Sequence, residues 1–230
     1  MNQLQTRAII LNRTDYGEAD RIISLLTPEH GKLSLMARGV RRAKSKLAGG
    51  IELFSVADIS YIKGRGQIGT LTSARLVHYY DSIVQSIDRV QLGYELIKLL
   101  NRATEDQPEP EYFELLEAAF AALDAPTIST GLIRLWFEAQ LLRYAGHSPN
   151  LKTDTEGEKL AADKLYNFDF DTVAFTVHTQ GHFSSDHIKF LRLVFSGNAP
   201  QILSHINDLD SLLPDCVPVV QTMLQTYIRI

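Results

Sequence analysis

The 230-residue chain is 45% hydrophobic and 22% charged, with a formal net charge of −4 at pH 7. These totals are typical of a globular protein with one large domain or two small ones. No apolar run approaches the roughly 20 residues of a membrane span, and the N-terminal segment lacks the basic start and apolar length of a signal peptide. We therefore expect a cytoplasmic protein that is not held in a membrane.

Five short strands are expected in the first 80 residues, because apolar and β-branched residues alternate there between turn-forming segments. A turn with Pro28 and Gly31 separates the second strand from the third. So many short strands, with little room for a helix between them, predict a small barrel. The expected strands cover residues 6–12, 21–27, 32–38, 51–62 and 68–79.

Helical periodicity replaces this pattern after Asp81, which we take as a helix N-cap. Residues 147–184 are polar and turn-rich, with a short hairpin expected in 167–184. The sequence thus predicts an α+β chain with a barrel domain at 1–80 and a helical domain at 81–230. Apolar residues at helical spacing in the first helix are Ile83, Ile87, Val90, Tyr94 and Ile97. Later helices are expected at 111–125, 127–146 (ended by Gly146), 184–197, 199–208 and 218–230.

The two parts differ in charge. Residues 1–80 hold 12 Lys and Arg against 6 Asp and Glu, a net of +6, whereas residues 81–230 hold 11 against 21, a net of −10. A basic part in an acidic chain indicates a polyanionic partner, because affinity for nucleic acid depends on cations that replace counterions.

The basic excess is concentrated in "ARGVRRAKSK", residues 37–46. No carboxylate lies between Glu29 and Glu52, and glycines flank the segment, so we predict an exposed loop of unpaired cations between the third and fourth strands. The alternative is a solvated loop that only keeps the protein soluble. The cations are Arg38, Arg41, Arg42, Lys44 and Lys46.

In a five-stranded oligonucleotide-binding (OB) barrel, ligands lie between the loop that joins strands one and two and the loop that joins strands four and five. The first of these loops, residues 12–21, carries Arg13 and Arg21, and the second, residues 63–67, carries Lys63 and Arg65. We predict that these four cations join the basic segment in contacting phosphates.

Aromatic side chains on which bases can stack are the other requirement of a single-strand binder. Tyr16, Phe54 and Tyr61 are the candidates. Tyr16 is favoured because it lies among polar residues in the expected first loop, whereas Phe54 lies among apolar residues and is expected in the core.

No catalytic set is recognised. Ser184, Asp186 and His187 are sequence neighbours and do not form a triad by adjacency. "GRGQIG" at 64–69 joins two expected strands and opens no helix, so it is not a dinucleotide fingerprint. We therefore expect a protein that is not an enzyme and uses no cofactor.

Residues 6–74 resemble the N-terminal domain of the bacterial recombination mediator RecO. The resemblance is carried, in order, by "TPEHGK" (27–32), "ARGVRRAKS" (37–45) and "GRG" (64–66). The segment "LWFEAQLLRYAGHSPNL" (135–151) resembles the second domain of the family more loosely. The resemblance implies an OB domain followed by a helical domain.

The resemblance also implies an activity and partners. The activity is binding of single- and double-stranded DNA, annealing of complementary strands, and help in loading RecA onto DNA coated with single-stranded-DNA-binding protein. The implied partners are RecR and the C-terminal tail of the single-strand binder, with the protein associated with the nucleoid in the cytoplasm. The basic loop would then hold DNA, and the acidic helical domain would meet proteins.

The chain departs from the resemblance where many members have four cysteines spaced as a zinc site. Its one cysteine, Cys216, excludes a tetra-thiolate zinc in these 230 residues and fits a reducing compartment. His178, His182 and His187 lie close together, but no acidic or thiolate set completes a metal site, so we expect surface histidines and no metal. Aromatic packing is expected to replace the metal, with Phe168, Phe170, Phe175 and Phe183.

Two other functions stay open: an RNA-binding OB module, and a non-enzymatic protein adaptor whose barrel binds peptides. Competition between DNA and RNA, and the salt dependence of binding, would separate them from a DNA binder. A pocket for a tail that ends in a carboxylate should pair apolar residues with a cation. The cations available in the helical domain are Arg89, Lys98, Arg102, Arg134, Arg143, Lys189 and Arg192.

Overall fold

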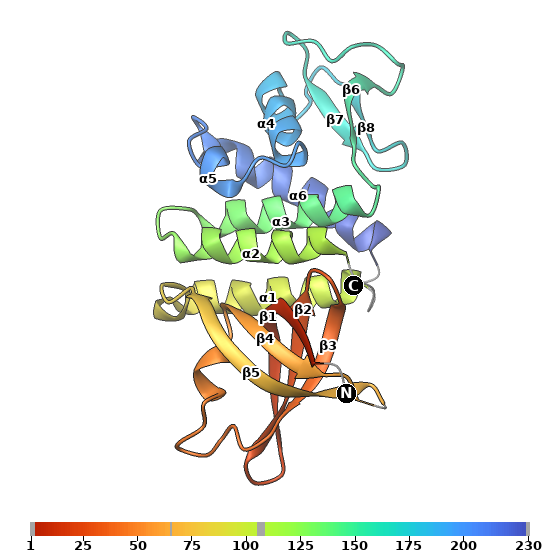
Figure 1. Cartoon of the computed structure of the whole chain (residues 1–230). Helices are drawn as coiled ribbons and strands as arrows, with labels where there is room; N and C mark the ends of the chain where they lie inside the picture. Colours follow the sequence, from red (N-terminus) through yellow and green to blue (C-terminus); the bar gives the residue numbers. More distant parts are fainter. Residues whose placement is uncertain (1–2, 65, 105–108, 229–230) are drawn as a thin grey trace. The chain divides into compact units, whose positions relative to one another are not determined.

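The computed structural model describes residues 3–64, 66–104 and 109–228, and the chain forms two compact units, Met1–Ala125 and Pro126–Ile230. The first unit begins with five strands that wrap around a common core (Figure 1). They are β1 (Gln3–Tyr16), β2 (Asp20–Thr27), β3 (Gly31–Ala37), β4 (Ser55–Ile62) and β5 (Ile68–Tyr79).

The five strands close into a barrel in the order β1-β2-β3-β5-β4, which confirms the predicted OB-type architecture. Neighbouring strands are antiparallel except β3 and β5, which are parallel. Alternate side chains point inward, as the period of two requires. Ile10, Ile23, Leu25, Leu35 and Ile59 are among the buried residues that fill the interior.

Two strand ends differ from the sequence prediction. β1 continues to Tyr16 because its last residues pair with β2 as far as Tyr16 opposite Asp20, so the expected loop 12–21 is a hairpin arm closed by a short turn. β4 begins at Ser55 and not at residue 51, because residues 48–50 form a 3₁₀ turn and Phe54 has a left-handed φ of 57°.

Phe54 occupies this unusual backbone position because its ring is buried between the barrel and two helices. These helices are α1 (Ile87–Ala103) and α2 (Pro110–Asp124). The Phe54 ring contacts Tyr94 and Phe120 edge-on, each at a centroid distance of 5.4 Å. Gly93 of α1 lets the ring approach, since a Cβ at that position would lie 2.5 Å from it. The prediction that Phe54 belongs to the core is confirmed.

The start of α1 differs from the prediction, and the predicted apolar stripe is buried only in part. Asp81 is not an N-cap: a 3₁₀ turn, Ile83–Gln85, intervenes, and Ser86 precedes α1. Ile97 of the predicted stripe is buried together with Leu92, Leu96 and Leu100, whereas Ile87 is 85% exposed. The reason is that α1 carries two apolar stripes, and the stripe beside Gly93 is the one that can approach Phe54.

The second unit is built around α3 (Thr130–Tyr144), which is buried over most of its length. Ser129 caps it, and Gly146, with a φ of 81°, follows its end as predicted. The prediction placed the last helix at 218–230, yet α6 starts earlier and contains two prolines that the sequence pattern suggests as breaks. The other helices are α4 (Ser185–Phe195), α5 (Pro200–Leu203) and α6 (Leu209–Tyr227).

Residues 150–177 form a small sheet in the order β6-β8-β7. The predicted hairpin is present as β7 and β8, and β6 adds a parallel strand. Phe175 is fully buried and contacts Phe168 and Phe183 at 5.1 and 5.4 Å, so aromatic packing holds the segment together as predicted. Phe170 is 42% exposed and lies outside that packing except for its contact with Phe168. The strands are β6 (Asn150–Asp154), β7 (Tyr166–Asp169) and β8 (Ala174–Val177).

Within the described part of the chain, no helix combines the length and the apolar character needed to cross a membrane.

Candidate nucleic-acid interface

The basic segment forms an exposed loop between β3 and β4, here called the basic loop (residues 38–46). All five of its cations are exposed. The buried side chain of Val40 anchors the loop to the barrel core, and Leu47 and Ile51 pack beside it. The loop therefore presents its cations from a fixed base.

The backbone of the basic loop is also tied to the turn between β1 and β2. The Arg41 amide donates to the Ala19 carbonyl at 2.9 Å, and the Gly39 amide donates to Asp20 Oδ1 at 2.7 Å. Gly39 has a φ of 63°, a conformation that glycine adopts without strain. Figure 1 shows both segments at the end of the barrel away from α1. We call this end, residues 15–21 with the basic loop, the basic rim.

The fold brings Asp15 into the basic rim. Its carboxylate lies 2.8 Å from Arg21 Nε and 3.5 Å from Arg41 Nε. The hydrogen bond from Arg21 lowers the pKa of Asp15, and the positive charges of Arg41 and Arg13 act in the same direction. The prediction that all five loop cations are unpaired is thus wrong for Arg41, because β1 supplies a carboxylate from outside the loop.

The other four loop cations keep their charge available. Arg38, Arg42, Lys44 and Lys46 make no ion pair with any residue that the structure describes. Outside the loop, Arg13 is already engaged, because its guanidinium lies 2.6 Å from Glu52 and its side chain is only 23% exposed. The free positive charge of the rim therefore belongs to these four residues.

Tyr16 is the aromatic side chain placed to meet a nucleic acid at the rim. It ends β1, and it is 55% exposed. The prediction that it sits in a loop is wrong, but its exposure is what stacking needs. Phe54 and Tyr61 are 2% and 3% exposed, so neither can stack on a base, and burial raises the pKa of Tyr61.

The loop between β4 and β5 is not part of the basic rim. Lys63 is exposed and directly follows Ile62, which pairs with Gln3 at the start of β1. The rim lies at the other end of β1, where Tyr16 pairs with Asp20. Arg65 lies outside the described residues. Of the nine predicted contact residues that the structure describes, Lys63 is therefore separated from the other eight along β1.

The outer face of β2 and β3 lies beside the rim. Ile22 pairs with Met36, and Ser24 pairs with Ser34, all four being partly exposed. None of these is aromatic, so this face offers small and apolar side chains on which a strand can lie but no ring for stacking.

The three histidines do not come together as a site. His178 and His182 are exposed, whereas His187 is partly buried in the first turn of α4, where its Nδ1 accepts from the Ser184 amide at 3.2 Å. Its Nε2 lies 3.2 Å from Asp215 Oδ2, so His187 has a structural role in place of the expected surface one. No group of three or more potential ligand side chains gathers among the described residues.

An OB barrel with a basic rim, continued by a helical region, defines a class of nucleic-acid-binding architecture. Family models agree with this class: "Recombination protein O N terminal" matches residues 1–80, and "Recombination protein O C terminal" matches residues 85–200. The chain belongs to the RecO family of DNA-repair and recombination proteins, which are not enzymes.

Curated relatives point the same way. The DNA repair protein RecO of Dehalococcoides mccartyi is 35% identical over 152 residues, which cover 66% of this chain and 59% of that protein. That of Myxococcus xanthus is 33% identical over 150 residues, covering 65% and 61%. That of Rubrobacter xylanophilus is 31% identical over 147 residues, covering 64% and 59%. The matched segment thus spans about three-fifths of these relatives.

Sequence reasoning missed the carboxylates that organise the rim. Asp15 and Asp20 are visible in the sequence, but nothing local indicates that one pairs with Arg41 and the other holds Gly39. Only the strand pairing shows that the β1–β2 hairpin arm brings residues 15–20 beside the loop that follows β3.

Proposed function

We propose that this chain binds single- and double-stranded DNA through the basic rim, anneals complementary strands, and assists the loading of RecA onto DNA coated with single-stranded-DNA-binding protein. The observation that supports this most is the basic loop: four exposed cations that form no ion pair with a described residue, held on a fixed base beside an exposed tyrosine. Cations bind phosphates without reading sequence, and a ring stacks on any base.

Membership of the RecO family supports the same proposal and extends it to partners. We infer that RecR and the C-terminal tail of the single-strand binder are protein partners, and that the protein works on the nucleoid in the cytoplasm. The negative charge of residues 81–230 fits this division, since an acidic part repels DNA.

A groove in the second unit is our candidate for the tail. It has a volume of about 500 Å³ and lies between α4 and the start of α6. Lys189 lines it with Phe190, Leu193 and Leu212, which is the pairing of a cation with apolar side chains that such a tail needs. Lys189 also pairs with Asp186 at 2.9 Å, but both side chains are well exposed and such pairs are weak, so a terminal carboxylate can replace Asp186.

The DNA proposal is tested by fluorescence anisotropy with labelled single-stranded DNA, double-stranded DNA and RNA of equal length over a series of salt concentrations. We expect the affinity for DNA to fall as the salt concentration rises. We also expect unlabelled DNA to displace the labelled DNA more effectively than unlabelled RNA does. Absence of salt-dependent binding would refute the proposal and favour a protein adaptor, whereas preference for RNA would favour the RNA-binding alternative.

The tail proposal is tested by anisotropy of a labelled tail peptide with the intact chain. Lys189→Gln should weaken binding by about tenfold, the effect of losing one charge-assisted hydrogen bond of roughly 1.5 kcal/mol. Lys159→Gln removes the same charge from an exposed position outside the groove and should leave binding unchanged. Equal binding by both variants would place the tail site elsewhere.

A further inference from the structure

The basic rim contains three carboxylates beside its six cations, and each carboxylate has a different environment. Asp20 is used by the fold, because its Oδ1 accepts from the Gly39 amide at 2.7 Å. Glu18 is exposed and makes no ion pair with any residue that the structure describes. Of these three described residues, Asp15 is the one whose carboxylate lies against arginine side chains of the rim. Asp15 therefore acts on the charge that a nucleic acid would meet.

Asp15 bridges two arginines that come from different parts of the rim. The strand register places Asp15 of β1 directly opposite Arg21 of β2, and Arg41 reaches the same carboxylate from the basic loop. Asp15 Oδ1 lies 2.8 Å from Arg21 Nε, and Asp15 Oδ2 lies 3.5 Å from Arg41 Nε. Each carboxylate oxygen thus meets a separate guanidinium group. One negative charge therefore offsets half of the positive charge that these two arginines carry.

The arrangement is one that a phosphate group would adopt in the same place. Carboxylates and phosphates both present paired oxygens, and arginine binds the two anions with the same N–H donors. The Asp15 side chain is 54% exposed, so a DNA phosphate can reach the two guanidinium groups from solvent. In the DNA-free protein, Asp15 therefore occupies the position of a phosphate.

The ion pairs of Asp15 are of the kind that exchange readily. The side chains of Arg21 and Arg41 are 30% and 36% exposed, and exposed pairs are weak because water screens them. The basic loop keeps its attachments without Asp15, since the Arg41 amide donates to the Ala19 carbonyl and Val40 is buried in the barrel core. Displacing the Asp15 carboxylate therefore costs the rim little of its shape.

We propose that Asp15 competes with DNA phosphates for Arg21 and Arg41, and that a bound single strand displaces it. The competition lowers the affinity of the rim and shortens the time for which it holds a strand. Annealing needs such release, because the paired product must leave the surface that held the first strand. This inference rests on the proposed function, since it concerns the DNA that the rim binds.

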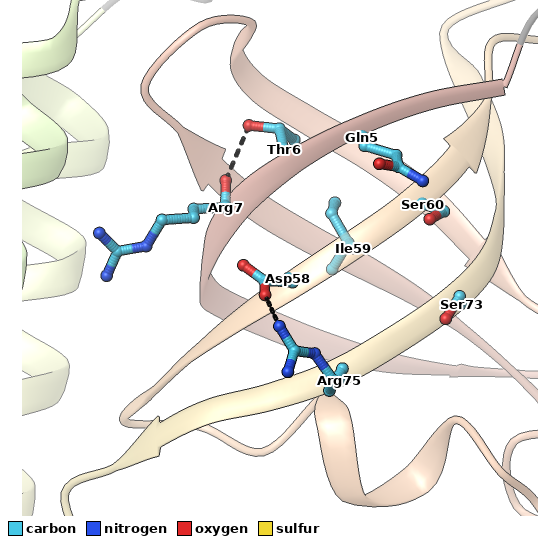
Figure 2. A pocket seen from close by; sticks show the side chains of 8 residues that line it. All are labelled: Gln5, Thr6, Arg7, Asp58, Ile59, Ser60, Ser73 and Arg75. Atoms are coloured by element: carbon cyan, nitrogen blue, oxygen red, sulfur yellow. Dashed lines mark hydrogen bonds and ion pairs between the residues drawn. The ribbon is translucent and has the colours of Figure 1, made fainter.

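Another ion pair of the barrel provides a comparison away from the rim. Figure 2 shows Asp58 of β4 pairing with Arg75 of β5, two residues that the strand register also sets opposite each other. The Arg75 side chain is 79% exposed, so removing the Asp58 carboxylate frees an arginine there as well. Asp58 lies opposite Arg7 of β1, which precedes Asp15 by about 27 Å along the strand at roughly 3.4 Å per residue.

The test compares three substitutions in the intact chain, each of which removes one negative charge. Asp15→Asn frees the two rim arginines, whereas Asp58→Asn frees an arginine away from the rim. Glu18→Gln removes a carboxylate that pairs with no described residue from the turn next to Asp15. Affinity for labelled single-stranded DNA is measured by anisotropy at several salt concentrations, and dissociation is followed after adding unlabelled competitor. Circular dichroism checks that each variant is folded.

We expect Asp15→Asn to bind about five- to tenfold more tightly at about 150 mM salt, the effect of relieving two exposed ion pairs. The gain should lie mainly in slower dissociation, because variants of one interface differ mostly in their off-rates. The salt slope should steepen by about 0.7 for each arginine that gains a phosphate, which a merely structural pair would not do. Glu18→Gln and Asp58→Asn should change affinity by less than about twofold, since neither frees a rim arginine and salt screens distant charges.

Adding Arg21→Gln and Arg41→Gln to Asp15→Asn should abolish the gain, and a gain that persists without these arginines would overturn the inference. Weaker binding by Asp15→Asn would overturn it too, because Asp15 would then hold the arginines in place for DNA. Equal gains in all three single variants would show that total charge alone matters, against the inference.

The outcomes also separate this inference from the proposed function. Wild-type protein without salt-dependent DNA binding would refute the proposed function itself. Salt-dependent binding by the wild type, with the same affinity and salt slope in Asp15→Asn, would refute only the displacement of Asp15.

Discussion

Removing the unpaired cations of the basic loop is the sharpest test of how the rim binds DNA. Arg38, Arg42 and Lys44 are exposed and make no ion pair with a described residue, so changing all three to Gln leaves no buried charge behind. Arg41 is kept, because its contacts with Asp15 and with the Gly17 carbonyl help to fix the loop. The fold should survive, since exposed loop positions tolerate substitution.

The expected size follows from counterion release. Each phosphate neutralised on a single strand contributes about −0.7 to the slope of log affinity against log salt, so losing three contacts should flatten the slope by about 2. When salt is raised from about 50 to about 200 mM, the variant should therefore lose roughly 20-fold less affinity than the wild type loses. Sequences should be affected nearly alike, because phosphate contacts position a strand without reading it.

The assay is anisotropy with labelled single-stranded DNA at several salt concentrations, with circular dichroism to show that the variant is folded. The matched control, Lys98→Gln/Arg102→Gln/Lys159→Gln, removes three exposed charges that belong to α1 and to the second unit. A folded loop variant with the affinity and the salt slope of the wild type would refute the reasoning and leave the loop as a solvated surface. An equal effect in the control would show that net charge alone matters.

Tyr16→Ala should weaken single-strand binding by about 1–3 kcal/mol through lost stacking and leave the salt slope unchanged, and a changed slope in the same anisotropy titration would contradict stacking. Burial raises the pKa of Cys216 to about 12, so the thiol should stay protonated and resist a thiol reagent at pH 8 until the protein unfolds. Rapid labelling of native protein would contradict that burial. Elemental analysis should find less than one zinc per chain, and a full equivalent that is lost in His182→Ala would overturn the expected absence of a metal.

The barrel was predictable because its signals are local. Alternation of apolar residues identified the strands, and Pro28 and Gly31 identified the turn that joins β2 to β3. The hairpin arm of β1 was missed because residues 12–16 are polar on both sides. A strand arm that projects beyond a core needs no apolar face, so its sequence looks like a loop.

The helical errors have a tertiary cause. The sequence of α1 offers more than one apolar stripe, and packing against the Phe54 ring, which requires glycine at position 93, selects the one that is buried. Helical periodicity identifies the apolar stripes of a sequence, but it does not indicate which stripe packs against a neighbouring element. The two prolines within α6 are tolerated for a similar reason: tertiary packing can outweigh their local cost.

The candidate site was predicted in composition but not in arrangement. The basic loop and Tyr16 share one end of the barrel, whereas Lys63 lies at the other end of β1. Loop cations appear equivalent in a sequence, and only strand register shows which of them share a surface. The same register sets Asp15 opposite Arg21, which no local pattern indicates because the two residues lie on different strands of the hairpin.

The packing of α1 and α2 on the barrel leads to a prediction about fragments. Phe54 contacts Phe120 of α2, and Lys32 of β3 donates to the carbonyls of Asn101 and Thr104 at the end of α1, at 2.9 and 2.7 Å. A fragment of residues 1–80 would expose the Phe54 ring, whose burial alone stabilises the fold by about 1.5–3 kcal/mol. We therefore expect that residues 1–125, unlike residues 1–80, fold stably as a separate fragment and keep the DNA affinity of the whole chain. Thermal unfolding followed by circular dichroism would measure this, and a fragment of residues 1–80 that unfolds cooperatively at the same temperature as residues 1–125 would show that the two helices add nothing to the stability of the barrel.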